Sequence, residues 1–126
     1  MPARILIADD YDDNRELLRL MLEGDGHTIQ EARNGRECVE LAQADPPDIC
    51  LIDLSMPLLD GWGVLRELRA DARTRDIPCV AVTAFADAGL IRKNVEEDFD
   101  AYISKPFRGK DLLETVARML DVKSEQ

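Results

Sequence analysis

The chain has 126 residues, of which 45% are hydrophobic and 33% charged, and its formal net charge is −10. This size and balance predict one soluble domain, spanning residues 1–126, that buries a core of its own. There is no apolar run of the roughly 20 residues that a membrane helix needs, no signal-peptide pattern and no basic stripe, so we expect a cytoplasmic protein with no membrane or nucleic-acid partner.

Strand and helix patterns alternate along the chain. Short apolar runs predict strands at 4–8, 28–32, 49–54, 79–83 and 101–104. Apolar residues at helical spacing predict helices over 14–23, 36–44, 61–70, 87–98 and 110–120. Asp13 is expected to cap the first helix, and Gly24 or Gly26 to end it.

The repeated strand–helix order predicts an α/β fold, because right-handed crossovers place successive strands in one parallel sheet. We expect a doubly wound, five-stranded, flavodoxin-like sheet in the order 2-1-3-4-5, with helices on both faces. Ligands of such sheets bind at the carboxyl ends of the strands, near the switch point between strands 1 and 3. Residues with chemical roles should therefore follow the strands.

Polar side chains do follow four of the expected strands. Asp9 and Asp10 follow the first strand, Asp53 lies at the end of the third, Thr83 ends the fourth, and Lys105 follows the fifth. Clustered carboxylates without histidine or cysteine favour a Mg²⁺ site. A lysine and a hydroxyl beside such a site are what phosphoryl transfer needs, so Asp53, Thr83 and Lys105 are the predicted catalytic residues.

Each of these residues alone also has an ordinary structural explanation. Adjacent acids such as Asp9 and Asp10 favour helix starts, a threonine often ends a strand, and a lysine after a strand is usually solvated. An aspartate such as Asp53, after an apolar run, is harder to explain without a partner. The joint pattern, with every member at a strand end, is what favours function.

The cysteines and the single histidine carry no recognisable chemistry. The spacings of Cys38, Cys50 and Cys79 match neither a metal site nor a redox motif, so we expect small buried or half-buried thiols. His27 is expected to be a surface or edge residue, and Trp62 to pack at the start of its helix.

Four stretches of the chain resemble the receiver domain of two-component response regulators. They are ILIADD at the first strand, LIDLSMPLLDG around Asp53, VAVTAFA at the fourth strand and AYISKPF at the fifth. The resemblance covers about residues 4–121 and is strongest to small single-domain regulators of the chemotaxis and cell-division kind. It implies a phosphorelay protein whose Asp53 becomes a 4-aspartylphosphate, with a sensor histidine kinase or histidine phosphotransfer protein as donor.

The resemblance also implies the metal ligands. Asp10, Asp53 and the backbone carbonyl of Ser55 would bind Mg²⁺ directly, and Asp9 through a metal-bound water. Such a domain catalyses only its own phosphorylation and dephosphorylation, so we do not expect an enzyme with a separate substrate.

The same resemblance implies a switch. Lys105 would bridge to the phosphoryl group, Thr83 would move to hydrogen-bond it, and Tyr102 would follow. The surface formed by 87–98, 101–104 and 110–120 would then contact an unknown downstream protein or a second copy of the chain. The peptide bond between Lys105 and Pro106 is expected to be cis.

The chain departs from the family pattern in two places. Ser55 and Phe85 stand two residues beyond Asp53 and Thr83, at positions that modulate the lifetime of the phosphate in this family. The sequence EEDFD, at 96–100, replaces the usual glycine before the fifth strand and is expected to change that turn.

Three other functions fit the fold class less well. A flavodoxin-like FMN electron carrier is the main alternative, but it would need a phosphate-binding loop where the chain has the acidic run 9–13. A phosphatase of the haloacid dehalogenase type would need an aspartate in place of Ser55. A P-loop NTPase is excluded, since no glycine-rich loop ends in Lys-Ser/Thr.

Overall fold

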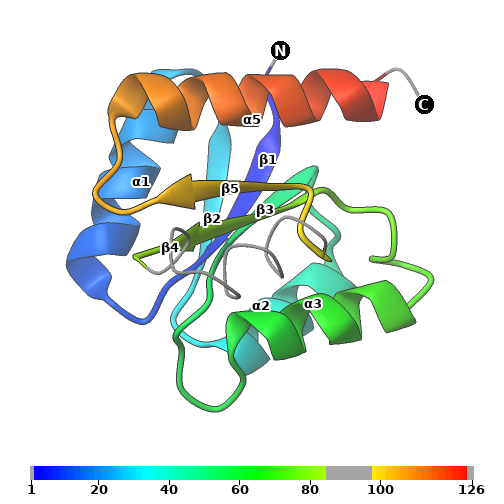
Figure 1. Ribbon diagram of the computed structural model, residues 1–126. Helices are drawn as coiled ribbons and strands as arrows, with labels where there is room; N and C mark the ends of the chain where they lie inside the picture. The colour runs from blue at the N-terminus through cyan, green and yellow to red at the C-terminus, as the bar shows by residue number, and fades with distance from the viewer. Residues whose placement is uncertain (1, 85–97, 125–126) are drawn as a thin grey trace.

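The computed structural model describes residues 2–84 and 98–124 (Figure 1). In chain order the elements are β1 (Arg4–Ala8), α1 (Asp12–Gly24), β2 (Thr28–Ala32), α2 (Gly35–Ala44), β3 (Ile49–Asp53), α3 (Gly61–Ala70), β4 (Cys79–Thr83), β5 (Ala101–Ser104) and α5 (Gly109–Ser124). The helix expected over 87–98 lies almost wholly outside the described residues. Among the described helices, none is both long and apolar enough to cross a membrane.

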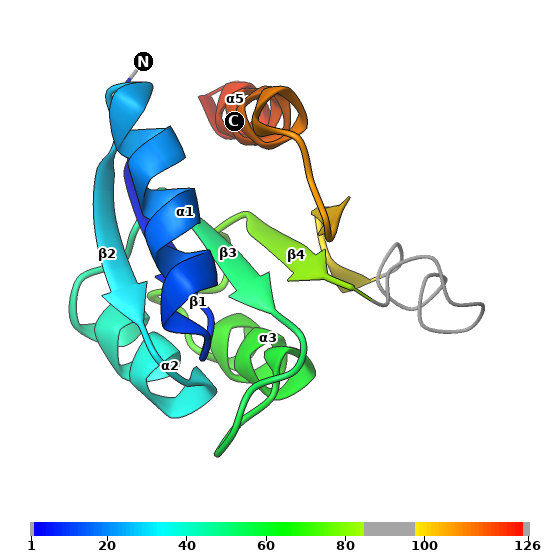
Figure 2. The ribbon, with the colours of Figure 1, turned by 90° about the vertical axis from the view of Figure 1, so that its left-hand side faces the viewer.

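The sheet confirms the predicted fold. Its strands are all parallel and lie in the order β2-β1-β3-β4-β5. Helices α1 and α5 cover one face, and α2 and α3 cover the other (Figures 1 and 2). The chain reverses its direction of strand addition between β1 and β3, which places the switch point beside the end of β3.

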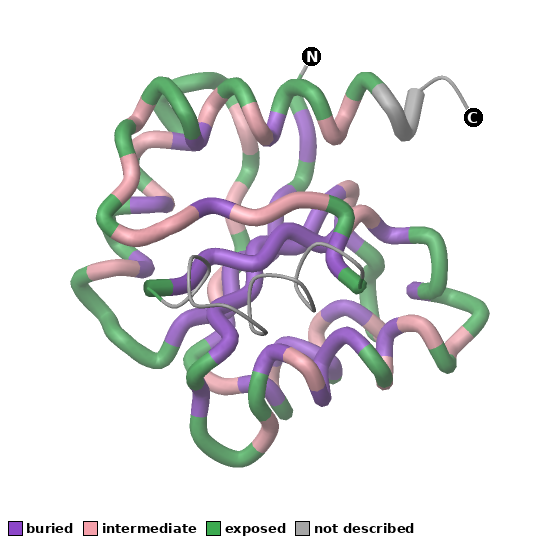
Figure 3. The backbone as a smooth tube through the Cα atoms, viewed as in Figure 1, coloured by how far each residue is buried: buried purple, intermediate pink, exposed green. Residues whose placement is uncertain are grey.

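The central strands form the middle of the core (Figure 3). Every residue of β3 and β4 is buried, as expected for parallel strands covered on both faces. Cys38, Cys50 and Cys79 are free thiols, all fully buried in the layer under α2 and α3. The expectation of small buried thiols is therefore confirmed. Hydrogen bonds with the thiols of Cys38 and Cys79, together with burial, raise the pKa of Cys50, which keeps it protonated.

The helix ends follow local sequence rules with one exception. Asn34 caps α2 by accepting from Glu37 N at 2.8 Å, and Asp60 caps α3 by accepting from Gly63 N at 2.8 Å. The expected cap on α1 is wrong: the N-cap is Tyr11, without a side-chain cap, and Asp13 lies in the first turn, where its charge still favours the helix N-terminus. As predicted, α1 ends at Gly24.

His27, expected to be a surface or edge residue, directly precedes the edge strand β2, but its side chain does not lie on the surface. Its side chain is only 6% exposed, and its Nδ1 accepts a hydrogen bond from Ala3 N at 3.1 Å. The turn at Gly26, with φ of 93°, precedes this position. The imidazole thus satisfies a backbone donor that lies before β1 and would otherwise lack a partner in the ladder.

The turn before β5 is fixed by a polar clamp, which we define as Arg69 with Asp100. Asp100 Oδ2 accepts from Cys79 N at 2.7 Å and from Arg69 Nη2 at 2.9 Å. Arg69 Nη1 also donates to Ile77 O at 2.7 Å and Arg75 O at 2.8 Å. The last residue of EEDFD therefore joins the starts of β4 and β5 to the end of α3.

Aromatic packing connects α3 to the same turn. Trp62, in the first turn of α3, meets Phe99 edge to face, with ring centroids 5.4 Å apart and an interplanar angle of 67°. Phe99 is buried, and Trp62 packs partly buried against the core, as expected for its position. The pair links the loop that follows β3 to the segment that enters β5.

Candidate functional site

Four strand ends meet at the carboxyl-terminal edge of the sheet. Asp9 directly follows β1, Asp53 is the last residue of β3, and Thr83 is the last residue of β4. Lys105 directly follows β5. Parallel pairing of these strands brings residues that are far apart in the sequence to the switch point of the fold.

Three carboxylates form a cluster at this edge. Asp9, Asp10 and Asp53 each offer one oxygen, and these oxygens lie within 4.8 Å of one another. Oxygens that share one Mg²⁺ at about 2.1 Å lie within about 4.2 Å of each other, so the spacing of this cluster is close to the spacing that one ion needs. An all-oxygen donor set suits a hard divalent cation, and the residues present therefore fit Mg²⁺.

Asp9 and Asp10 differ in what their carboxylates do. Asp9 is 1% exposed, and both of its oxygens are used: Oδ1 accepts from Tyr11 N at 2.8 Å and Oδ2 from Lys105 Nζ at 3.1 Å. Asp10 is exposed. The arrangement leaves Asp10 better placed than Asp9 to turn an oxygen to a metal ion.

Lys105 is the cation of the site. Its Nζ lies 3.1 Å from Asp9 Oδ2 and 3.5 Å from Asp53 Oδ2, and its side chain is 19% exposed. One ammonium among three carboxylates leaves an excess of negative charge, which a divalent cation would balance. The following peptide bond, to Pro106, is cis as predicted.

Burial sets the proton affinity of Asp53. Loss of hydration raises the pKa of this carboxyl above its usual range, and the neighbouring Asp9 raises it further. The Lys105 ammonium and the Ser55 N–H, which donates to Asp53 Oδ1 at 3.2 Å, oppose that rise without cancelling it. In the folded chain, the neighbours of Asp53 therefore balance its negative charge only in part.

Thr83 and Ser55 lie next to this group. Thr83 is buried. It directly follows Val82, which pairs with Asp53 between β4 and β3. The carbonyl of Thr83 accepts from Lys105 N at 3.0 Å, so the end of β4 holds the backbone of the lysine. Ser55 is exposed in the loop after β3. Phe85 lies outside the described residues.

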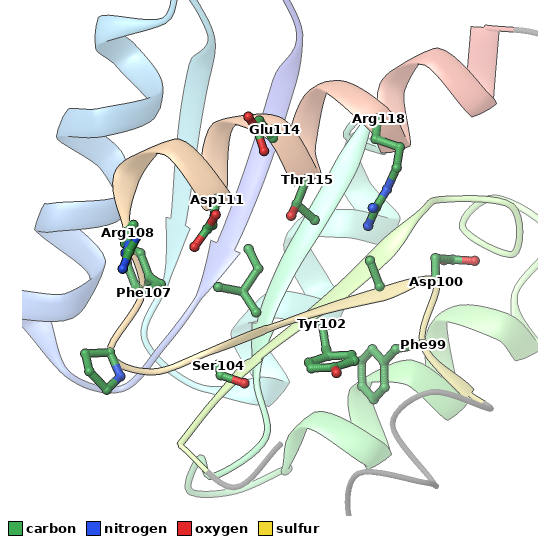
Figure 4. A pocket seen from close by; sticks show the side chains of 13 residues that line it. Phe99, Asp100, Tyr102, Ser104, Phe107, Arg108, Asp111, Glu114, Thr115 and Arg118 are labelled. Carbon is green, nitrogen blue, oxygen red and sulfur yellow. The ribbon is translucent and has the colours of Figure 1, made fainter. Parts of the chain in front are cut away.

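Tyr102 is not part of the acidic cluster. It lies in the middle of β5, partly buried against the layer under α2 and α3. It lines a groove of about 730 Å³ between β5 and α5 (Figure 4). The walls of the groove include Phe99, Ser104, Asp111 and Arg118, so it is charged at α5 and aromatic near Tyr102.

The sequence reasoning missed Arg15. This residue lies on the apolar stripe of α1, in line with Leu18 and Leu22, and is buried with them. The signal was available, because a charged residue at a core-facing helical position needs a partner. Its contacts reach the main chain of Asp9.

A buried aspartate, an acidic pair and a lysine at the switch point of a 2-1-3-4-5 sheet define a signalling domain of the receiver class. The sequence model of the response regulator receiver domain matches residues 5–117. The chain belongs to this family and is the receiver domain of a two-component system.

Relatives and solved structures agree with this membership. The chain is 36% identical over 120 residues to the polar-differentiation response regulator DivK of Brucella anthropi, covering 95% of this chain and 98% of that protein. The receiver domain of a sensor histidine kinase of Pseudomonas aeruginosa, solved with a magnesium ion coordinated in its active-site cleft, superposes with a TM-score of 0.88 at 30% identity, covering 96% and 99%. The receiver domain of a Syntrophus aciditrophicus histidine kinase superposes with a TM-score of 0.86 at 32% sequence identity, covering 94% of this chain and 90% of that one.

Proposed function

We propose that Asp53 is the phosphoacceptor of this receiver domain. The observation that carries the proposal is the position of its carboxylate, buried at the switch point between the acidic pair and Lys105. The donor would be a phosphohistidine on a sensor histidine kinase or a histidine phosphotransfer protein. An oxygen of Asp53 attacks phosphorus, the N–P bond breaks, and the electron pair stays on the imidazole, which takes a proton from water.

The chain supplies the groups that hold the reacting phosphoryl group. Asp10, Asp53 and the Ser55 carbonyl would bind Mg²⁺, with Asp9 acting through a water. The bound ion supplies positive charge for the carboxylates and the phosphoryl oxygens. Lys105, already 3.5 Å from Asp53, would donate to a phosphoryl oxygen once the acceptor carries it.

The new charge would then act as a switch. A phosphoryl group adds about 1.5 to 2 negative charges and three strong acceptors. Thr83, at the end of β4, would turn to donate to one of them, and Tyr102 would follow by changing its position beside the groove of β5 and α5. That surface is the proposed contact for an unknown downstream protein or for a second copy of the chain in a homodimer.

Apolar side chains frame the approach to the site. Tyr11 is 65% exposed and Leu58 is 80% exposed. Leu58 lies in the loop after Asp53 at φ of 69°, a conformation that is unfavourable for a branched side chain. Exposed apolar residues on both sides of a buried acceptor are consistent with docking of the donor protein over the site.

In this proposal the domain catalyses only its own phosphorylation and dephosphorylation and has no separate substrate. Ser55 and Phe85 would set how long the phosphate persists. The domain would act in the cytoplasm, where histidine kinases present their phosphorylated groups.

Incubation with acetyl phosphate and Mg²⁺ tests the proposal. Intact mass spectrometry is expected to show one phosphoryl adduct that is stable to acid and labile to base. The adduct should be absent with EDTA and in Asp53→Asn, and present in Asp71→Asn, which alters an acid at the opposite edge. No adduct on the unmodified chain, or an adduct that survives Asp53→Asn, would contradict the proposal.

A further inference from the structure

A buried arginine lies behind the acidic cluster. The side chain of Arg15 is 9% exposed and shares the inner face of α1 with Leu18 and Leu22. An arginine at such a position loses much of its hydration and remains charged, so it must find acceptors inside the fold. The acceptors that Arg15 finds are specific.

Each part of the Arg15 guanidinium has its own partner. Nη1 donates to the carbonyl oxygen of Asp9 at 2.8 Å, Nη2 donates to Asp12 Oδ1, and Nε donates to Glu31 Oε1 at 3.3 Å. Asp12 and Glu31 balance the charge of Arg15. The contact with Asp9 is to the main chain and adds no ion pair to the cluster.

The carbonyl that Arg15 holds belongs to the peptide group between Asp9 and Asp10. The N–H of Asp9 donates to Ala32 O at 3.1 Å, and its Oδ1 accepts from Tyr11 N at 2.8 Å. Arg15 N itself donates to Tyr11 O at 3.0 Å. The short segment between β1 and α1 is thus held by several hydrogen bonds. The bond from Arg15 fixes the plane of the peptide group that joins Asp9 to Asp10.

We propose that Arg15 is a positioning residue for Mg²⁺. By holding the Asp9 carbonyl it sets the direction of the Asp10 carboxylate toward Asp53, and it does so through its geometry, since its charge is already paired. The inference rests on the proposed function, in which these acids bind the ion. Ligands that are held in place before binding lose less entropy when the ion arrives.

Two variants of Arg15 separate geometry from charge. Arg15→Met keeps the length of the stem and removes all donors. Arg15→Lys keeps the charge, but an ammonium cannot reproduce the three directed contacts of the planar guanidinium. Glu31→Gln is the matched control, because it removes the charge of one partner of Arg15, keeps an acceptor oxygen there and leaves the contact with Asp9.

The measurement is the Kd for Mg²⁺ alone, by isothermal titration calorimetry, on variants shown by urea unfolding to be folded under those conditions. Both Arg15 variants are expected to raise the Kd about 10- to 100-fold, the usual effect of losing a residue that orients a ligand. Glu31→Gln should stay near the unmodified chain. Labelling of Arg15→Lys by acetyl phosphate should recover as Mg²⁺ is raised to saturation.

The outcomes separate the two proposals. An unmodified chain that binds no Mg²⁺ would overturn the proposed function and this inference with it. If the unmodified chain binds and Arg15→Lys binds equally well, charge alone suffices and only the role of Arg15 is wrong. Should Arg15→Met not fold, Arg15→Lys alone decides between a raised and an unchanged Kd.

Discussion

The two edges of the sheet use the same kinds of charged residue in opposite ways. At the amino-terminal edge the carboxylates are paired: Asp48 Oδ2 accepts from Arg4 N at 2.8 Å, and Asp100 is held in the polar clamp with Arg69. There Arg73 and its own backbone N–H hold the pKa of Asp71 at about 2. The carboxylates named here thus find arginine or backbone N–H partners within the chain itself.

The carboxyl-terminal edge is left unbalanced. Asp9, Asp10 and Asp53 share one lysine, and burial raises the pKa of Asp53. The comparison shows that the chain can pair aspartates well where structure is the only requirement. Poor pairing at the other edge is consistent with the proposed function, in which an ion and a phosphoryl group would complete the site.

The largest expected effect is on the unbalanced edge. Lys105→Met removes the cation that contacts the carboxylates of Asp9 and Asp53 and should slow labelling by acetyl phosphate about 100-fold, as loss of one group that stabilises developing charge usually does. Arg69→Met, which removes a cation from the opposite edge, should leave the rate for folded protein unchanged. Rates are compared at saturating Mg²⁺. Equal slowing in both variants would remove the distinction between the edges.

The next effect is on the paired edge and concerns stability. Asp100→Ala leaves Cys79 N without an acceptor and should lower the free energy of unfolding by about 1–3 kcal/mol. Asp100→Asn keeps an acceptor oxygen and should lose less. Urea unfolding measures both. If the alanine variant instead lost phosphoryl uptake while keeping its stability, the clamp would be functional rather than structural.

A smaller effect should depend on pH. Because the folded chain raises the pKa of Asp53, this group favours folding below the ordinary value of 3.8, and that contribution is lost as pH rises through the folded value. Without Mg²⁺, Asp53→Asn should therefore be more stable than the unmodified chain at neutral pH. The difference should shrink as pH falls toward 3.8, which urea titrations at several pH values would show. If Asp53→Asn were less stable than the unmodified chain at neutral pH, the expected effect of the raised pKa would be wrong.

The smallest effect should come from Asp71. Its folded pKa of about 2 lies below the ordinary 3.8, so its pairing favours folding above 3.8 and is lost as pH falls through about 2. The carboxyl carbon of Asp71 should titrate near that value by NMR and move toward 3.8 in Arg73→Met. Because the pair is exposed, neutral-pH stability should change little. If Asp71 of the unmodified chain titrated near 3.8 instead, its pairing would be weak and the contrast between the two edges of the sheet would be smaller.

The sequence predicted much of the fold and the principal members of the site. Strand ends are fixed by apolar runs and crossover rules, so the gathering of Asp9, Asp10, Asp53 and Lys105 followed from topology and is confirmed by the structure. The roles assigned to these residues remain proposals.

The features that the sequence did not reveal depend on long side chains that reach across elements. Arg15, the clamp between Arg69 and Asp100, and the buried His27 each make contacts that no local spacing encodes. Their partners include both backbone atoms and carboxylates of other segments. Only the packed arrangement of helices on the sheet determines which carbonyl or N–H comes within reach.

The edge-to-face pair of Trp62 and Phe99 has a practical consequence. Trp62 is the only tryptophan in the chain, so all indole emission reports on one ring. That ring begins α3, just after the loop from Asp53, and rests on the residue that leads into β5. The protein therefore contains an optical reporter at the junction between the proposed acceptor and β5. Movement at that junction should change the fluorescence of a single residue without any added dye.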